Sequence, residues 1–118
     1  MRISDAELEV MKVIWIKNEA TSSEIIEGLK DFKWSYNTIR TMISRLEKKG
    51  AIKVLKKTGK VYTYKSMVDE SKYKNEITMD LIKKLYKNSV KNFIVEYCVA
   101  NKIDVKEIED VIKEIEKK

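Results

Sequence analysis

Polar side chains that can bond nucleic-acid bases or phosphates are concentrated in one short stretch, interleaved with apolar residues at helical spacing. They are Asn37, Thr38, Arg40, Thr41, Ser44, Arg45 and Lys48. Asparagine can form two hydrogen bonds to adenine, arginine can form two to guanine, and a threonine methyl group can touch that of thymine. Asn37, Arg40 and Thr41 are therefore predicted to contact bases. Phosphate contacts, which fix register without reading sequence, are predicted for Thr38, Ser44, Arg45 and, further along the chain, Lys56, Lys57 and Lys60.

The charge distribution favours a polyanionic partner. Residues 33–65 carry ten basic side chains and one acidic one, whereas residues 1–32 are net acidic and residues 66–118 are balanced. The whole net charge of +6 therefore comes from the middle of the chain. Such a concentrated positive charge attracts nucleic acid and releases its counterions, so binding should be strongest at low salt. The alternative is a basic surface that is merely solvated.

Three helices are predicted to position these side chains. The segments Ser4–Glu7 and Thr21–Glu24 have capping-box spacing, which marks the start of a helix, and Ser35 can cap a third. Gly50 ends the third helix because it can adopt the left-handed backbone conformation. The apolar positions of this third helix are Ile39, Met42, Ile43 and Leu46.

After Gly50 the pattern changes to two short segments rich in β-branched and aromatic residues, 52–56 and 61–65. They are joined by the turn 57–60, and a β-hairpin is predicted. Three helices followed by a basic hairpin are typical of a winged helix-turn-helix DNA-binding domain, here residues 1–68. Tyr62 and Tyr64 share a strand face and are expected to pack the hairpin on the third helix. The predicted DNA contacts are Ser35, Asn37, Thr38, Arg40, Thr41, Ser44, Arg45, Lys48, Lys56, Lys57 and Lys60.

Residues 69–118 have the pattern of three further helices, the middle one apolar on nearly all sides. A segment of about fifty residues is only marginally able to build a core of its own, so a second copy of the chain is expected to cover it. The alternative is packing on the winged helix of the same chain. The predicted dimerisation residues are Ile77, Leu81, Leu85, Val90, Phe93, Ile94, Tyr97, Ile108, Val111, Ile112 and Ile115. The overall fold class is thus mainly α with a small β-hairpin wing.

Composition argues against several other classes of protein. The chain has no histidine, a single cysteine, Cys98, and no glycine-rich phosphate loop, so neither an enzyme, a zinc site nor any cofactor is predicted. No apolar run approaches the length of a membrane span, and a cytoplasmic protein is expected. Two alternatives to a DNA-binding protein stay open: a protein-interaction adaptor with an incidental basic surface, and an RNA-binding module.

Two blocks of sequence closely resemble the penicillinase repressor family, BlaI and MecI. They are ISDAELEVMKVIW at residues 3–15 and WSYNTIRTMISRL at residues 34–46, followed by Lys48-Lys49-Gly50. A looser likeness extends over the C-terminal helices. In that family the position of Tyr36 is commonly proline and that of Asn37 commonly lysine. The resemblance implies a homodimeric winged-helix repressor that binds an inverted-repeat operator, with the C-terminal helices of the two chains intertwined.

The resemblance also implies how such a repressor is released. Members that respond to β-lactams control resistance genes and are cut within the dimerisation region, between an asparagine and a phenylalanine, through a membrane sensor pathway. Alignment places Glu96 and Tyr97 at that bond. Copper-responsive relatives carry paired cysteines in the C-terminal tail, and residues 111–118 have none. A switch driven by a ligand or another partner is the alternative.

Overall fold

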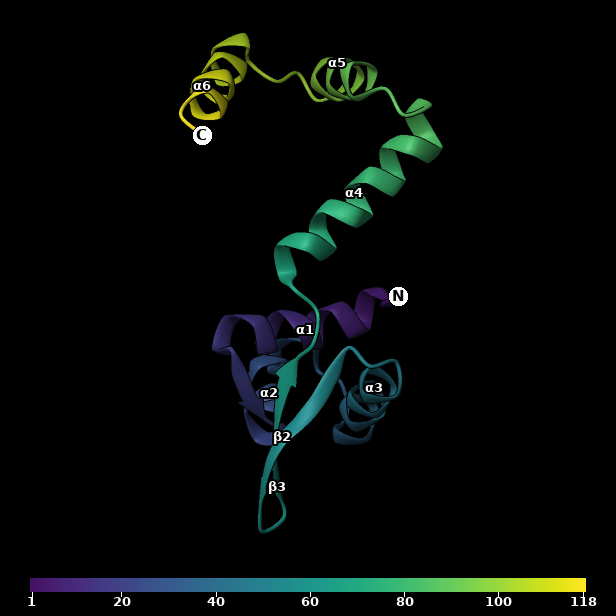
Figure 1. Cartoon of the computed structure of the whole chain (residues 1–118), viewed down its shortest axis with the longest axis vertical. Helices are drawn as coiled ribbons and strands as arrows, with labels where there is room; N and C mark the ends of the chain where they lie inside the picture. Colours follow the sequence, from purple (N-terminus) through teal and green to yellow (C-terminus); the bar gives the residue numbers. More distant parts are fainter. The chain divides into compact units, whose positions relative to one another are not determined.

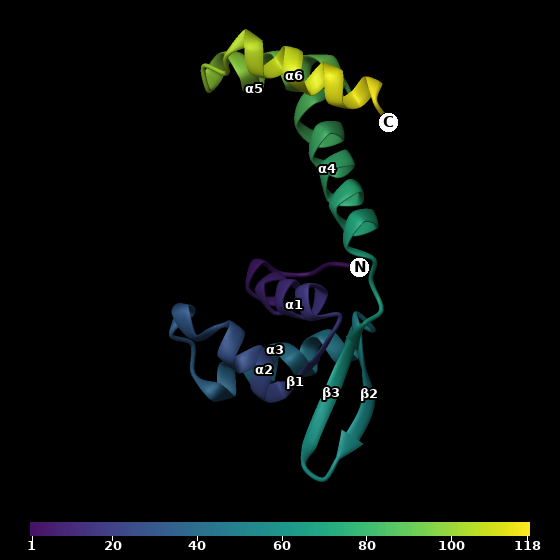
Figure 2. The same cartoon turned by 90° about the vertical axis from the view of Figure 1, so that its left-hand side faces the viewer.

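A computed structural model describes all 118 residues as two compact units, residues 1–73 and 74–118. In the first unit α1 lies across α2 and α3, and a hairpin extends beyond the helices (Figures 1 and 2). Its elements are α1 (Asp5–Lys17), β1 (Glu19–Thr21), α2 (Ser22–Gly28), the 3-10 helix η1 (Lys30–Phe32), α3 (Tyr36–Lys48), β2 (Ile52–Thr58) and β3 (Val61–Ser66). This is the winged helix-turn-helix that the sequence predicts.

The predicted helix starts are confirmed at atomic detail. Ser4 accepts a hydrogen bond from the Glu7 amide at 3.1 Å, and the Glu7 side chain accepts one from the Ser4 amide at 2.9 Å. Thr21 and Glu24 form the same reciprocal pair. These caps satisfy amides that a helix leaves unpaired at its start. The connection before α3 is less simple than predicted, because it includes the 3-10 turn η1.

A three-stranded antiparallel sheet has the order β1-β3-β2. Its edge strand β1 was not predicted: Ala20 pairs with Tyr64, far along the chain, and three residues show no period of their own. The hairpin strands are also longer than predicted. Thr58 pairs directly with Val61, so the turn is only two residues long, with φ +62° at Gly59. Such a positive φ is what two-residue hairpin turns require.

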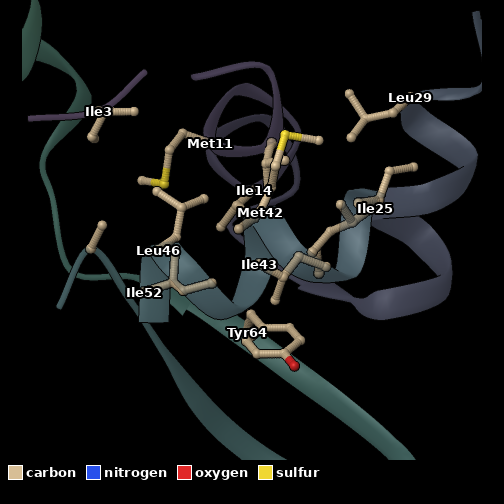
Figure 3. Packing of buried hydrophobic residues seen from close by; sticks show 14 residues of the cluster. Ile3, Met11, Ile14, Ile25, Leu29, Met42, Ile43, Leu46, Ile52 and Tyr64 are labelled. Carbon is tan, nitrogen blue, oxygen red and sulfur yellow. The ribbon is translucent and has the colours of Figure 1, made fainter. Parts of the chain in front are cut away.

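The core of the first unit lies between α1, α2, α3 and the sheet. Met11 and Ile14 of α1 meet Met42 and Leu46 of α3, and the ring of Tyr64 closes the core from β3 (Figure 3). All four predicted apolar positions of α3 are buried, which confirms its orientation. Trp15 packs at the edge, where its indole N–H donates to Ser66 and to the Val68 carbonyl oxygen. The same ring lies 6.0 Å from that of Tyr73, centroid to centroid.

The remaining helices are α4 (Glu70–Tyr86), which begins in the first unit, α5 (Val90–Ala100) and α6 (Val105–Glu116). Ser89 caps α5 by accepting a hydrogen bond from the Asn92 amide, and Asp104 caps α6 by accepting one from the Lys106 amide. Lys87 and Asn88 both have positive φ and separate α4 from α5. None of the chain's helices is both long and apolar enough to span a membrane. The division between residues 68 and 69 stays a prediction.

Candidate nucleic-acid interface

The helix α3 is held so that one face is buried and the other is free. Ser35 caps its start by accepting a hydrogen bond from the Thr38 amide at 3.1 Å. Gly50 follows its end with φ +80°, and Ala51 donates to the Leu46 carbonyl oxygen at 2.9 Å. Apolar residues at helical spacing fix the buried face against α1. The polar face of α3 therefore points away from the core.

All predicted DNA contacts of α3 are exposed. A shallow groove along the helix is lined by Asn37, Arg40, Thr41, Ser44, Arg45 and Lys48, so the structure brings these six together. Thr41 donates its hydroxyl proton to the Asn37 carbonyl oxygen at 2.9 Å, which leaves its methyl group for apolar contact. The hydroxyls of Ser35 and Thr38 bond each other at 2.8 Å, and they therefore serve the cap as well. The assignment of bases to individual residues stays a prediction.

The wing carries the other predicted contacts. Lys56, Lys57 and Lys60 are all exposed. A bulge at Leu55 interrupts the pairing between Val54 and Lys56, which shifts the register of the outer half of the hairpin. The three lysines lie in this outer half of the hairpin, where their ammonium groups are accessible to phosphates.

The two tyrosines of β3 have different environments. Tyr64 is only 8% exposed and belongs to the core, as expected, whereas Tyr62 is 36% exposed. The ammonium group of Lys57 lies 5.2 Å from the centroid of the Tyr62 ring. Burial, with the Glu47 carboxylate as a second cause, raises the pKa of the Tyr64 phenol above its ordinary value. Tyr64 therefore has a packing role.

A second groove runs between α3 and the wing. Tyr36, Arg40 and Ser44 line it from α3, and lysine and tyrosine side chains line it from the hairpin. The start of α2 contributes Ser22 and Ser23, which the sequence did not single out. Three cations from two elements, Arg40, Lys57 and Lys60, thus border one concave surface that also contains one carboxylate, that of Glu47. The excess of positive charge suits the backbone of a duplex. Tyr36 is the aromatic residue of this surface that sequence reasoning missed, although its exposed position at a helix start is visible in the pattern.

A partly buried ion pair joins the C-terminal end of α3 to α1. The Lys49 ammonium group contacts the Glu7 carboxylate at 2.5 Å and donates to the Arg2 carbonyl oxygen at 2.8 Å. The Glu7 side chain is 3% exposed and that of Lys49 35%. Burial alone would raise the pKa of Glu7, but hydrogen bonds from Lys49 and Ser4 outweigh it and hold the pKa below its ordinary value of 4.5. Lys49 therefore has a structural partner that the neighbouring lysine, Lys48, lacks.

The predicted dimerisation residues lie on α4, α5 and α6. None of them is buried within the chain: Phe93 and Ile108 are half-buried and the others are exposed. The ring of Phe93 contacts that of Tyr86 edge-on, with 5.2 Å between centroids. The helix α5 is the most apolar of the three, yet none of its residues is buried within the chain. The predicted cleavage residues Glu96 and Tyr97 lie within this helix, both exposed.

Comparison with known proteins identifies the chain. A family model described as penicillinase repressor matches residues 3–117. The chain belongs to the penicillinase repressor family. Methicillin resistance regulatory protein MecI of Staphylococcus aureus strain N315 is 39% identical over 117 residues, covering 98% of this chain and 94% of the relative. The family resemblance seen in the two sequence blocks is thereby confirmed.

Two solved structures of penicillinase repressors resemble the first unit. The solution structure of the DNA-binding domain of the repressor BlaI has a TM-score of 0.56 and 51% identity, covering 61% of this chain and 88% of that one. Monomeric BlaI of Bacillus licheniformis, in complex with the blaP half-operator, has a TM-score of 0.53 and 49% identity, covering 62% and 89%. Both findings confirm the predicted winged-helix DNA-binding domain, and the family consists of transcriptional repressors rather than enzymes.

Proposed function

We propose that this chain represses transcription by binding an inverted-repeat operator as a homodimer. The observation that carries the proposal is the pair of basic grooves on α3 and between α3 and the wing. The Bacillus licheniformis relative, half identical over this region, was solved with the blaP half-operator, which supports DNA as the ligand. In this arrangement the start of α3 enters the major groove, and Lys56, Lys57 and Lys60 hold phosphates.

Gel-shift titration with the DNA upstream of the protein's own gene tests the proposal. We expect a retarded complex that resists a scrambled duplex of equal length and weakens steeply as salt rises. Competitor RNA of the same sequence should displace little of it. If the upstream duplex, the scrambled duplex and the RNA competed equally, the protein would have only a general basic surface and no sequence preference. No binding to any of them at low salt would favour the protein-interaction adaptor.

Dimerisation is the second part of the proposal. Large apolar side chains of the second unit are exposed in the isolated chain, including Ile94, Tyr97 and Val111, at 46–53% exposure. A second copy would remove this surface from water and would link two DNA-binding units. Linked units bind two half-sites far more tightly than one unit binds either. Light scattering at micromolar concentration should give twice the chain mass of 13.9 kDa, and a purely monomeric result would refute the dimer.

Truncation after Lys74 separates dimerisation from DNA reading. The fragment keeps the contacts of Trp15 with Ser66, Val68 and Tyr73, which a shorter one would lose. It should be monomeric, with much lower affinity for the full operator but unchanged affinity for a half-site. If the fragment bound the full operator as tightly as the whole chain does, the C-terminal helices would have no part in operator binding.

Release by proteolysis, with control of β-lactam-resistance genes, is the third part. It rests on the family membership and on the position of Glu96 and Tyr97 in an exposed helix. A peptide bond inside a helix is cut only when the helix opens locally, so α5 would have to unwind first. A cut there would separate α6 from the rest of the apolar surface and weaken the dimer.

Proteolytic release is tested by measuring the intact mass of the protein in cells that also make a β-lactam sensor. The protein is co-expressed with a β-lactam sensor of a related repressor system, and its intact mass is followed after exposure to a β-lactam. A cut at Glu96–Tyr97 and one at the chain's Asn92–Phe93 bond give fragments that differ by four residues. Derepression with the chain at full length would refute proteolytic release and point to a ligand or a partner as the switch.

A further inference from the structure

The first residue of α3 carries an aromatic ring on the predicted DNA-facing surface. Tyr36 is 55% exposed, whereas Tyr64 of the core is 8% exposed. One helical turn later, the guanidinium carbon of Arg40 lies 5.5 Å from the centroid of the Tyr36 ring. Residues four apart are neighbours on a helix, and a cation at this distance is attracted to the face of the ring. The ring of Tyr36 and the guanidinium group of Arg40 therefore form a cation–π pair.

The position of this pair matters for base reading. Early residues of a recognition helix are the ones that reach base edges in the major groove. An arginine that reads guanine must present two N–H donors in one plane, and its long side chain loses conformational freedom when it does so. A ring that already restricts the guanidinium reduces that loss. Arg40 also borders both grooves, so in a DNA complex an unrestrained side chain can bind a backbone phosphate instead of a base edge.

We propose that Tyr36 is a specificity-determining residue that positions Arg40 for reading one base pair. The inference rests on the proposed function, since it needs a sequence-specific DNA complex. The face of the ring makes the contact, so the hydroxyl group is not required and phenylalanine should replace tyrosine without loss. Direct contact of the ring with a thymine methyl group would instead make Tyr36 a reader in its own right.

Selection from a random DNA pool tests the proposal because it requires no operator of defined sequence. Each protein selects from one duplex pool with about 20 random base pairs, enough for two half-sites. The five full-length proteins are the wild type, Tyr36→Ala, Tyr36→Phe, Arg40→Ala and the double alanine variant. We expect Tyr36→Ala to weaken the preference by about two- to fivefold at the same base pair that Arg40→Ala relaxes. Tyr36→Phe should keep the wild-type preference, and Tyr36→Ala should add nothing once Arg40 is removed.

The wing supplies a matched control. Tyr62 forms the same kind of pair with Lys57, at 5.2 Å, but on a strand that is predicted to hold phosphates. Tyr62→Ala should lower affinity for all sequences alike and leave the selected sequence unchanged. The positioning role is overturned if Tyr36→Ala changes a different base pair, changes none, or adds its effect to that of Arg40→Ala. Failure of the wild type to enrich any sequence would instead refute the proposed operator binding itself.

Discussion

Replacing Lys49 with methionine should destabilise the first unit strongly, although the residue lies near the surface. The substitution removes the ammonium group from the buried Glu7 carboxylate and leaves the Arg2 carbonyl oxygen without its donor. Removing one partner of a buried ion pair costs about 3–5 kcal/mol, and losing one hydrogen bond to a charged group about 1.5–3 kcal/mol. Lys49 is a third exposed and Glu7 keeps its bond from the Ser4 amide, so we expect a loss of about 2–3 kcal/mol.

Urea unfolding followed by tryptophan fluorescence measures this loss. Both tryptophans, Trp15 and Trp34, lie in the first unit, so the signal reports that unit within the full chain. With a slope of about 1 kcal/mol per molar urea, the midpoint should fall by about 2–3 M. Protein concentration must be held constant, because the stability of a dimer depends on it.

Two further variants show whether the ion pair is the cause. Lys48→Met changes a neighbouring exposed lysine and should shift stability by less than about 0.5 kcal/mol. Glu7→Gln combined with Lys49→Met should be less destabilised than the sum of the single variants, because no unpaired charge remains buried. Strict additivity, or an unchanged midpoint for Lys49→Met, would refute the reasoning.

Three other outcomes are expected. The pKa of Glu7 is lowered in the folded chain, so the ionised carboxylate stabilises the fold above pH 4.5, and this stabilisation is lost as pH falls through the lower folded value. Wild type should therefore lose stability over this pH range, and Glu7→Gln, followed by fluorescence during acid titration, should lack this part of the loss. Lys57→Ala or Lys60→Ala should weaken binding to all duplexes similarly and reduce the slope of log affinity against log salt by about one, as anisotropy would show. Gly50→Ala should cost about 1–2 kcal/mol in urea unfolding through its φ of +80° alone, since a Cβ there meets no atom.

Local sequence patterns predicted most of the first unit because their causes are local. A capping box such as Ser4 with Glu7 involves residues three apart, and the apolar spacing of α3 depends on helical period alone. The hairpin was predicted for the same reason. Its strands proved longer because pairing continues to Thr58 and Val61, up to a turn that only Gly59 makes possible.

Two contacts between distant residues were not predicted. The strand β1 exists because Ala20 pairs with Tyr64, and nothing in residues 19–21 alone indicates a strand. Glu7 was recognised as a cap, but its partner Lys49 comes from the far end of α3. The candidate interface was likewise predicted only in part. The helical period of the apolar residues predicts which face of α3 is exposed, but the groove between α3 and the wing forms only once the sheet has folded.

The late position of β3 in the chain has a consequence for how the unit folds during synthesis. The pairing of β1 with β3 joins residues 19–21 to residues 63–65, so it closes a long loop and loses more chain entropy than the helices or the hairpin do. Helices α1, α2 and α3 emerge from the ribosome before the Tyr64 ring that closes their core. Until residues 61–66 have emerged from the ribosome, β3 cannot cover Ile43 and its apolar neighbours, and the sheet completes only when Ser66 is free.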